Sequence, residues 1–144
     1  MKALLDSSVL VAAMIESHPS HVNAADWVVR AKRREINAIV SAHTLAECYS
    51  VLTRIPPPQR ISPENAWRAI KENVLSVMDV IALTADDYRD LLEHLSQNGI
   101  AGGVVYDGVI AWVAVKAQVD QVVTLNTKDF RRIHPAIASQ LVVA

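Results

Sequence analysis

The fold of this chain is decided at its first strand–helix junction, the stretch Lys2-Ala3-Leu4-Leu5-Asp6-Ser7-Ser8. The short apolar run that opens the stretch predicts a buried strand. The Asp and Ser residues that follow are helix N-cap types, so residues 9–14 are expected to form a short helix. Either Asp6 or Ser8 can provide that cap, and capping by Ser8 would leave the Asp6 carboxylate available for another role.

Strand-like apolar runs alternate with helical patterns along the rest of the chain. The runs lie at residues 36–40, 77–83, 122–125 and 141–143. Two of the helices have clear starts, Ser62 with Pro63 at the first position and Thr84 with Asp87 as a capping box. The alternation predicts an α/β fold, in which a central, mostly parallel sheet of four or five strands is flanked by helices. We expect residues 1–144 to form a single domain.

The composition is that of a globular protein. Hydrophobic residues make up 51% of the chain and charged residues 20%, and the net charge of −1 gives no signature of a nucleic-acid-binding protein. The single cysteine, Cys48, cannot form an internal disulfide, which suits a reducing compartment. We find neither a secretory signal nor an apolar run of the roughly 20 residues that span a membrane, so a cytoplasmic protein without membrane contact is expected.

Four acidic residues stand at comparable points of this pattern. Asp6 and Asp129 follow strand-like runs, whereas Glu47 and Asp107 lie near the starts of helices. The carboxyl ends of parallel strands meet at one edge of a sheet, where such folds place their functional sites. Carboxylates gathered there repel one another unless a cation lies among them. The four positions therefore predict a divalent-metal site.

Helical periodicity distinguishes the two acids that lie near helix starts. Asp107 shares a helix face with the apolar residues at i+3, i+4 and i+7, so its carboxylate is expected to face inward. Glu47 lies off the apolar face that Leu45, Tyr49 and Leu52 define, and that position is typical of an exposed residue. Periodicity therefore selects Asp107 and does not select Glu47.

A polar cluster follows the run at 122–125. Thr124 offers a hydroxyl at the end of the strand, and Asn126 and Asp129 both stand where a fourth ligand is expected. The same Asn and Asp residues are also typical turn formers. Residue types alone leave open which of the two takes part in a site.

Taken in order, these segments resemble the motifs of the PIN-domain ribonucleases, and most closely those of the VapC-type toxins of bacterial toxin–antitoxin pairs. The matching segments are Leu4-Leu5-Asp6-Ser7-Ser8, Thr44-Leu45-Ala46-Glu47, the run from Asp107 to Ala114, and Thr124-Leu125-Asn126-Thr127-Lys128-Asp129-Phe130. Each motif alone is weak, but the ordered set at this chain length is specific.

The resemblance implies a catalytic site, a cofactor and a reaction. Its catalytic carboxylates would be Asp6, Glu47, Asp107 and Asp129, with Asp6 and Asp107 as metal ligands and Ser8, Thr124 and Asn126 in support. The implied cofactor is Mg²⁺, with Mn²⁺ as the alternative, and both ions suit carboxylate and water ligands. The implied reaction is hydrolysis of an RNA phosphodiester by a metal-activated water, which leaves 5′-phosphate and 3′-hydroxyl ends.

The resemblance also implies partners. We expect a homodimer, a small antitoxin whose tail covers the acidic pocket, and contact with DNA only through that antitoxin. The helices that carry Trp27, Tyr49 and Trp67 would provide the exposed apolar surface that such partners need, although these residues suit a core equally well.

Three alternative functions differ from this one in the residues that they require. A phosphorelay receiver domain would need a pair of acids after the first strand, but Asp6 stands alone. A haloacid-dehalogenase-type phosphatase would need Asp-x-Asp, and this chain has Ser8 at the third position. A PIN-like binding module without catalysis fits every motif, since only the fourth acid is in question.

Overall fold

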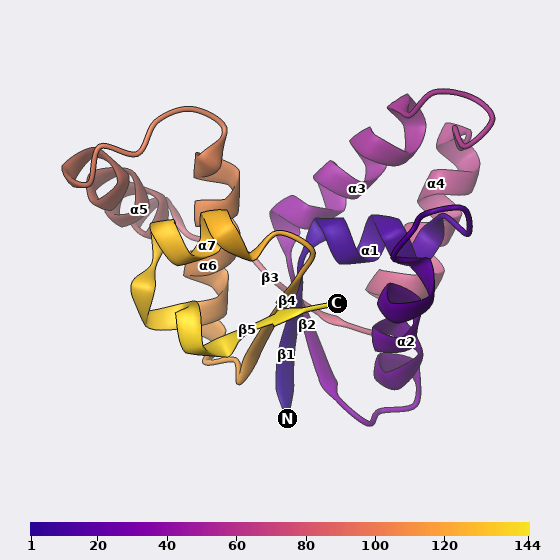
Figure 1. Cartoon of the computed structure of the whole chain (residues 1–144), viewed down its shortest axis with the longest axis horizontal. Helices are drawn as coiled ribbons and strands as arrows, with labels where there is room; N and C mark the ends of the chain where they lie inside the picture. Colours follow the sequence, from indigo (N-terminus) through magenta and orange to yellow (C-terminus); the bar gives the residue numbers. More distant parts are fainter.

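A single sheet of five parallel strands organises the molecule (Figure 1). The computed structural model describes residues 1–134 and 137–144 in full, and residues 135 and 136 by their backbone alone. The strands are β1 (Lys2–Leu5), β2 (Asn37–Ser41), β3 (Asp79–Ile81), β4 (Gln121–Thr124) and β5 (Leu141–Val143), in the spatial order β3-β2-β1-β4-β5. In the pairing register, Leu4 lies opposite Ile39 of β2 and Val122 of β4. The first strand of the sequence is therefore the central strand, and the predicted α/β fold is confirmed.

Helices cover both faces of this sheet. They are α1 (Ser7–Met14), α2 (His21–Lys32), α3 (Ala42–Arg54), α4 (Pro63–Ile70), α5 (Ala85–Gln97), α6 (Val104–Ala117) and α7 (Thr127–Ile133), with a π-helical turn η1 (Lys71–Leu75) and a 3₁₀ helix η2 (Pro135–Gln140). Helices α1 to α4 lie on one side of the sheet and α5 to α7 on the other (Figure 1). Within the described part of the chain, no helix combines the length and apolarity needed to cross a membrane.

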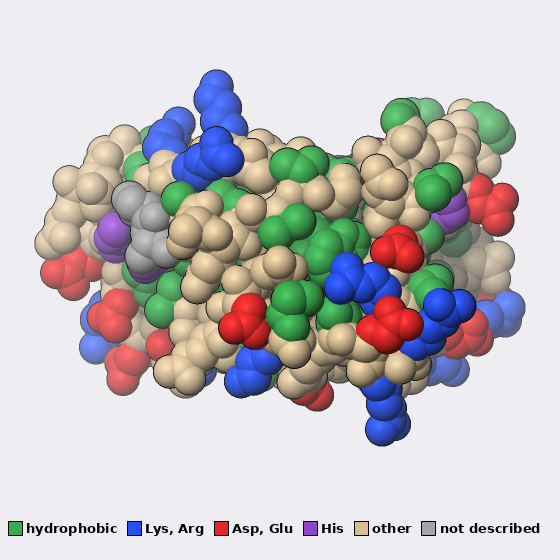
Figure 2. Space-filling model, turned by 60° about the horizontal axis from the view of Figure 1, so that its bottom comes forward, with side chains coloured by type: hydrophobic (Ala, Val, Ile, Leu, Met, Phe, Trp, Pro, Cys, Tyr) green, Lys and Arg blue, Asp and Glu red, His purple; other side chains and the backbone are tan. Residues whose placement is uncertain are grey.

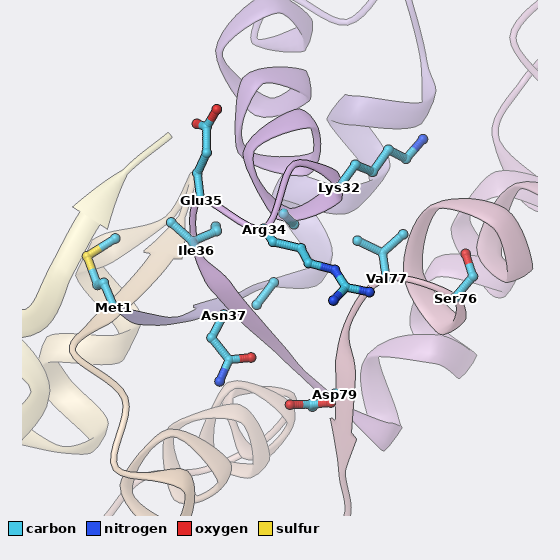
Figure 3. Close-up of a pocket in the computed structure, with 11 residues that line it drawn as sticks. Met1, Lys32, Arg34, Glu35, Ile36, Asn37, Ser76, Val77 and Asp79 are labelled. Carbon is cyan, nitrogen blue, oxygen red and sulfur yellow. The ribbon is translucent and has the colours of Figure 1, made fainter.

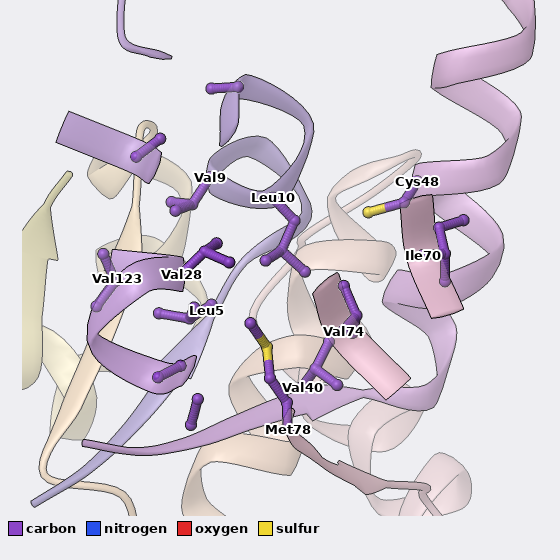
Figure 4. Packing of buried hydrophobic residues seen from close by; sticks show 14 of the residues in the cluster. Leu5, Val9, Leu10, Val28, Val40, Cys48, Ile70, Val74, Met78 and Val123 are labelled. Atoms are coloured by element: carbon purple, nitrogen blue, oxygen red, sulfur yellow. The ribbon is translucent and has the colours of Figure 1, made fainter. Parts of the chain in front are cut away.

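Alternating side chains along the strands build two separate cores. On β1, Leu5 packs into the core beneath α1 to α4, whereas its neighbour Leu4 packs into the core beneath α5 to α7. Figure 4 shows the first core, in which Leu5 lies among residues of α1 and α2, including Val9 and Val28. Because both faces of the sheet are covered, its chemistry is confined to its edges.

The helix starts follow the capping signals of the sequence. The Ser62 hydroxyl accepts a hydrogen bond from a backbone N–H of the first turn of α4, and Pro63 takes the first helical position. At α5, Thr84 Oγ1 accepts from the Asp87 N–H at 3.2 Å, and the Asp87 carboxylate accepts from the Thr84 N–H at 2.8 Å. The predicted capping box is therefore formed, with Asp in place of the usual Glu.

One predicted strand is much shorter than the apolar run that suggested it. Of the run at 77–83, only Asp79–Ile81 pairs with β2. The Val77 and Met78 N–H groups donate to the Val74 carbonyl, at 3.1 and 2.8 Å, so these two residues complete the helical turn before the strand. β3 is an edge strand, and its middle residue Val80 is 37% exposed.

A hollow lies at the amino ends of β1, β2 and β3. It has a volume of about 610 Å³, and its lining includes Met1, Lys32, Arg34, Glu35 and Asp79 (Figure 3). Figure 2 turns the lower end of the molecule forward, and acidic and basic side chains are interspersed there around apolar ones. Parallel α/β sheets bind ligands beyond the carboxyl ends of their strands, so this hollow lies at the opposite edge from the predicted site.

Candidate active site at the carboxyl edge of the sheet

The candidate site lies where β1 and β4 end side by side. The chain leaves β1 towards β2 and later returns to its other flank as β4, so the strand order reverses between β1 and β4. Asp6 directly follows β1, and its N–H donates to the carbonyl of Val123 in β4 at 3.0 Å. Asp6 is 4% exposed and Thr124 is fully buried. In open α/β sheets, a reversal of this kind opens the crevice in which ligands bind.

The Asp6 carboxylate accepts three short hydrogen bonds and lies close to a fourth polar group. Its Oδ1 accepts from the Ser7 N–H at 2.7 Å, and the Ser7 hydroxyl lies 3.3 Å from the same oxygen. Its Oδ2 accepts from the hydroxyls of Ser8 and Thr124, both at 2.8 Å. Asp6 is also the N-cap of α1, so the alternative in which Ser8 caps this helix is wrong.

The hydroxyls of Ser8 and Thr124 connect Asp6 to the loop after β4. Ser8 Oγ accepts from the Leu125 N–H at 3.1 Å, and Thr124 Oγ1 accepts from the Asn126 N–H at 3.0 Å. A hydroxyl has one proton to donate, and each of these two donates it to Asp6 Oδ2. Two backbone amides thus orient both hydroxyls and, through them, the carboxylate.

Helix α3 brings Glu47 to the same place. The Ser7 hydroxyl lies 2.9 Å from Glu47 Oε2 and 3.3 Å from Asp6 Oδ1, so these two carboxylate oxygens are no farther apart than the sum of the two distances. Ser7 therefore lies between the two acids, and its one hydroxyl proton is donated to the nearer oxygen, Glu47 Oε2. Sequence reasoning identified Ser7 only as a capping type, because nothing local indicates its contact with a residue 40 positions away.

The face of α3 that packs inward differs from the predicted one. Thr44, Cys48 and Leu52 are buried, whereas Tyr49 is 42% exposed. The small Cys48 side chain lies in the first core (Figure 4), and the larger Tyr49 faces solvent. The prediction that Tyr49 marks the apolar face is therefore wrong. The true face is adjacent to Glu47, which is why this acid is half-buried rather than fully exposed.

His43 stands one helical turn before Glu47. Its Nε2 lies 2.7 Å from Glu47 Oε1. Both atoms are buried, and neither has another partner among the described residues. Sequence reasoning missed His43, although the i, i+4 spacing of His and Glu is the signal that indicates such a pair.

Asp107 is in the first turn of α6. The residues at i+3, i+4 and i+7, Ile110, Ala111 and Ala114, are buried, which confirms the predicted apolar face. The Asp107 carboxyl is itself half-buried at the edge of this face.

Electrostatics connect all four acids. Burial, and then the negative charges of Asp6, Asp129 and Glu47, raise the pKa of the Asp107 carboxyl from 3.8 to about 6. Burial also raises the pKa of the Cys48 thiol to about 12, with further contributions from Glu47 and Asp6. Cys48 is therefore a protonated core residue, and the negative charges of the three other acids all reach the partly desolvated Asp107 carboxyl.

The two candidates for the fourth ligand contact each other. Asn126 Nδ2 donates to Asp129 Oδ2 at 3.1 Å, and both residues lie at the start of α7. The Asn126 N–H is already bonded to Thr124 Oγ1. Asn126 thus orients Asp129, and only Asp129 adds negative charge to the Asp107 environment.

The donor chemistry of this cluster fits a hard divalent cation. All of its charged groups are carboxylates, and no Lys or Arg among the described residues lowers the pKa of Asp107. Within that same part of the chain, no three His, Cys, Asp or Glu side chains are already arranged closely enough to hold an ion. The acids therefore belong to one electrostatic region without being closed around one point.

Similarity to known proteins agrees with this architecture. Ribonuclease VapC40 of Mycobacterium tuberculosis is 39% identical over 128 residues, which cover 89% of this chain and 87% of that protein. Ribonuclease VapC27 of the same species is 32% identical over 127 residues, or 88% of this chain and 84% of that protein.

Two solved structures share the fold. One is the Mycobacterium tuberculosis VapC20 toxin, described as cleaving the sarcin–ricin loop, with a TM-score of 0.70, 19% identity, and coverage of 89% of this chain and 92% of that one. The other is VapBC2 of Rickettsia felis bound to a promoter DNA fragment, with a TM-score of 0.66, 24% identity, and coverage of 100% and 98%. The PIN domain family profile matches residues 3–134. This chain therefore belongs to the PIN domain family.

Proposed function

We propose that residues 1–144 act as one PIN domain, and that the protein is a Mg²⁺-dependent endoribonuclease toxin of a toxin–antitoxin pair. The observation that carries the proposal is the gathering of acids at the carboxyl ends of β1 and β4, where the Ser7 hydroxyl lies between Asp6 and Glu47 and where the charges of Asp6, Asp129 and Glu47 reach Asp107 and raise its pKa. Uncompensated negative charge at the switch point of a parallel sheet is the setting expected of a cation-dependent hydrolase. The two VapC relatives are named as ribonucleases, which supports RNA as the substrate.

In this proposal, Asp6 and Asp107 hold the ion, which is Mg²⁺ or Mn²⁺. When bound, the ion supplies positive charge that acidifies a water nucleophile and stabilises the phosphate. Asp6 is suited to this role because its three short hydrogen bonds, from the Ser7 N–H and the Ser8 and Thr124 hydroxyls, fix its orientation before any ligand arrives. Its longest contact, 3.3 Å to the Ser7 hydroxyl, is the one most easily exchanged for a ligand.

Glu47 and Asp129 complete the proposed catalytic set. Glu47 is oriented at both oxygens, since Oε2 accepts from the Ser7 hydroxyl at 2.9 Å and Oε1 lies 2.7 Å from His43 Nε2. Asp129 is oriented by Asn126 and adds charge on the α7 side of the crevice. Ser8 and Thr124 are positioning residues, since they act on Asp6 and not on the substrate.

We further propose a cognate antitoxin and a homodimer as partners, with DNA contacted only through the antitoxin. Two of the structures that share the fold are VapBC assemblies, from Rickettsia felis and from nontypeable Haemophilus influenzae. Tyr49 and Trp67 are 42% and 51% exposed, so two of the aromatic residues singled out in the sequence are available on the surface. Exposed aromatic side chains are enriched in protein–protein interfaces.

Cleavage of RNA by antitoxin-free protein tests the proposed activity. We expect Mg²⁺ or Mn²⁺ to support cleavage and EDTA to abolish it. Asp6→Asn and Asp107→Asn should each reduce the rate by about 100-fold or more. Asn remains a good N-cap, so Asp6→Asn preserves the start of α1. The matched control is Asp90→Asn, an exposed acid on α5 outside the cluster, which should cleave like the wild type.

A PIN-like binding module without catalysis is the second candidate. It is favoured by one observation, that the described acids are not closed around a common point. The two functions predict different results in one experiment. A binding module retains RNA in the presence of Mg²⁺ without cleaving it, and Asp107→Asn then strengthens RNA binding because it removes a negative charge.

A further inference from the structure

A groove runs along α3 next to the candidate active site. It has a volume of about 350 Å³, and its lining includes His43, Glu47, Ser50, Arg54 and Tyr106. Four of these residues lie on one side of α3, three or four positions apart, and the fifth comes from the first turn of α6. Ser50, Arg54 and Tyr106 have no role in the proposed hydrolysis.

One end of the groove is a stacked aromatic pair. The rings of His43 and Tyr106 are nearly parallel, with 5.2 Å between centroids and 5° between planes. Tyr106 is 54% exposed, so much of its ring is open to solvent although one neighbour already stacks on it. An exposed aromatic ring held in a fixed plane is a platform on which a nucleobase can stack.

This platform is joined directly to the acidic cluster. Tyr106 immediately precedes Asp107 in α6, and His43 contacts Glu47 at 2.7 Å. A base on the platform would therefore lie beside Glu47, at the border of the acidic cluster. The groove leads away from that point along α3.

The far end of the groove is positively charged. Arg54 is exposed in the last turn of α3 and forms no salt bridge with any residue that the structure describes. It lies eleven residues beyond His43, which is about 16 Å along a helix at 1.5 Å per residue. Ser50 stands between the two and offers a hydroxyl. Along the groove, an aromatic plane is thus followed by a hydroxyl and then by an unpaired guanidinium. This order matches a base followed by a sugar–phosphate backbone.

We propose that this groove binds single-stranded RNA, with the base next to the scissile phosphate stacked on the His43–Tyr106 pair and a later phosphate at Arg54. The inference rests on the proposed function for its substrate, and it adds the position of the bound strand. Stacking discriminates poorly among bases, so the groove selects unpaired over paired RNA rather than a particular sequence.

Binding measured without metal tests the platform independently of cleavage. Short unpaired RNA oligonucleotides carry the fluorescent base 2-aminopurine at each position in turn, since stacking on an aromatic ring quenches it. We expect one position to be quenched by the wild type and by Tyr106→Phe. Tyr106→Leu should lose that quenching and about 5- to 100-fold in affinity. Tyr49→Leu is the matched control, because Tyr49 is similarly exposed on α3 but does not line the groove.

Arg54 is tested by the salt dependence of the same binding. Arg54→Gln should reduce the slope of log affinity against log salt by about one, as expected for one lost phosphate contact. The control is Arg89→Gln on α5, whose guanidinium is paired with Asp86 at 3.2 Å. An unchanged slope for Arg54→Gln overturns the assignment of the cationic end.

Cleavage by the wild type separates failure of this inference from failure of the proposed function. An RNA lacking the stacked base should be cleaved more slowly by the wild type, and Tyr106→Leu should add little to that loss. If the wild type cleaves no RNA, and Tyr106→Leu still abolishes quenching, the proposed activity is wrong but the groove is supported as an RNA-binding site. If the wild type cleaves and Tyr106→Leu binds RNA normally, the groove is wrong. Normal RNA binding with weakened binding of an antitoxin peptide would assign the groove to protein instead.

Discussion

Replacing Asp107 by Asn should stabilise the fold while destroying the proposed activity. The pKa of this carboxyl rises from 3.8 to about 6 on folding, which corresponds to about 3 kcal/mol of lost stability once the group is ionised in both states. Because the side chain is only half-buried, solvent screening reduces this to about 1–2 kcal/mol. Asn has nearly the same shape and no charge, so Asp107→Asn should recover that amount.

The gain should depend on pH with a definite sign. Below pH 3.8 the Asp107 carboxyl is protonated in the folded and the unfolded chain, so it costs nothing. Between pH 3.8 and about 6 the unfolded chain ionises first, and the folded state loses stability as the pH rises. Urea unfolding should therefore show most of the gain near pH 7.5 and less than half of it near pH 4.5.

Two controls accompany this measurement. Asp90→Asn on α5 removes an exposed acid outside the cluster, and its unfolding free energy should stay within about 0.5 kcal/mol of the wild type at both pH values. Mg²⁺ should stabilise the wild type more than Asp107→Asn, since only the wild type keeps both proposed ligands. A variant that is no more stable than the wild type at pH 7.5, or equally stabilised at both pH values, refutes the electrostatic argument.

Further predictions follow from the contacts of the site. Thr124→Val should destabilise the protein by about 1–3 kcal/mol in urea unfolding, because it removes a buried donor to Asp6 and the acceptor of the Asn126 N–H, whereas Thr124→Ser should retain most of the stability. Calorimetric Mg²⁺ affinity should fall by up to about tenfold per pH unit below pH 6, where protons compete for Asp107, and a constant affinity would contradict its role as a ligand. Asp129→Asn should slow RNA cleavage at least about tenfold more than Asn126→Ala, and the reverse order would make Asn126 the functional residue.

The fold could be predicted from the sequence because each of its parts carries a local signal. Strand-like runs alternate with helix starts, and the capping types at Ser62 and Thr84 place two helices within one residue of where they begin. The strand predicted over residues 77–83 is too long, and the reason is also local. Apolarity alone does not distinguish a strand from the last turn of a helix, and Met78 belongs to the latter.

The contacts of the candidate site could not be predicted in the same way. Thr124 and Asp6 are separated by 118 residues, and no local pattern encodes the hydrogen bond between them. The buried face of α3 was predicted from apolarity, which included Tyr49. In the structure the small Cys48 packs into the core, and the larger Tyr49 stays partly exposed. Residue types alone also could not show that the Asn126 amide donates to the Asp129 carboxylate, a contact that places both residues in the same cluster.

The central position of β1 has a consequence for the order in which the protein is made. Asp6 and Glu47 emerge early in translation, but the strand that flanks β1 on its other side, and the hydroxyl and acid that follow it, are encoded at residues 121–129. A nascent chain that stops short of β4 has Asp6 without Thr124 and Asp107 without Asp129. For a nuclease of the proposed kind, the crevice thus forms only after residues 121–129 have been synthesised, so a nascent chain that has not yet reached β4 has no finished active site.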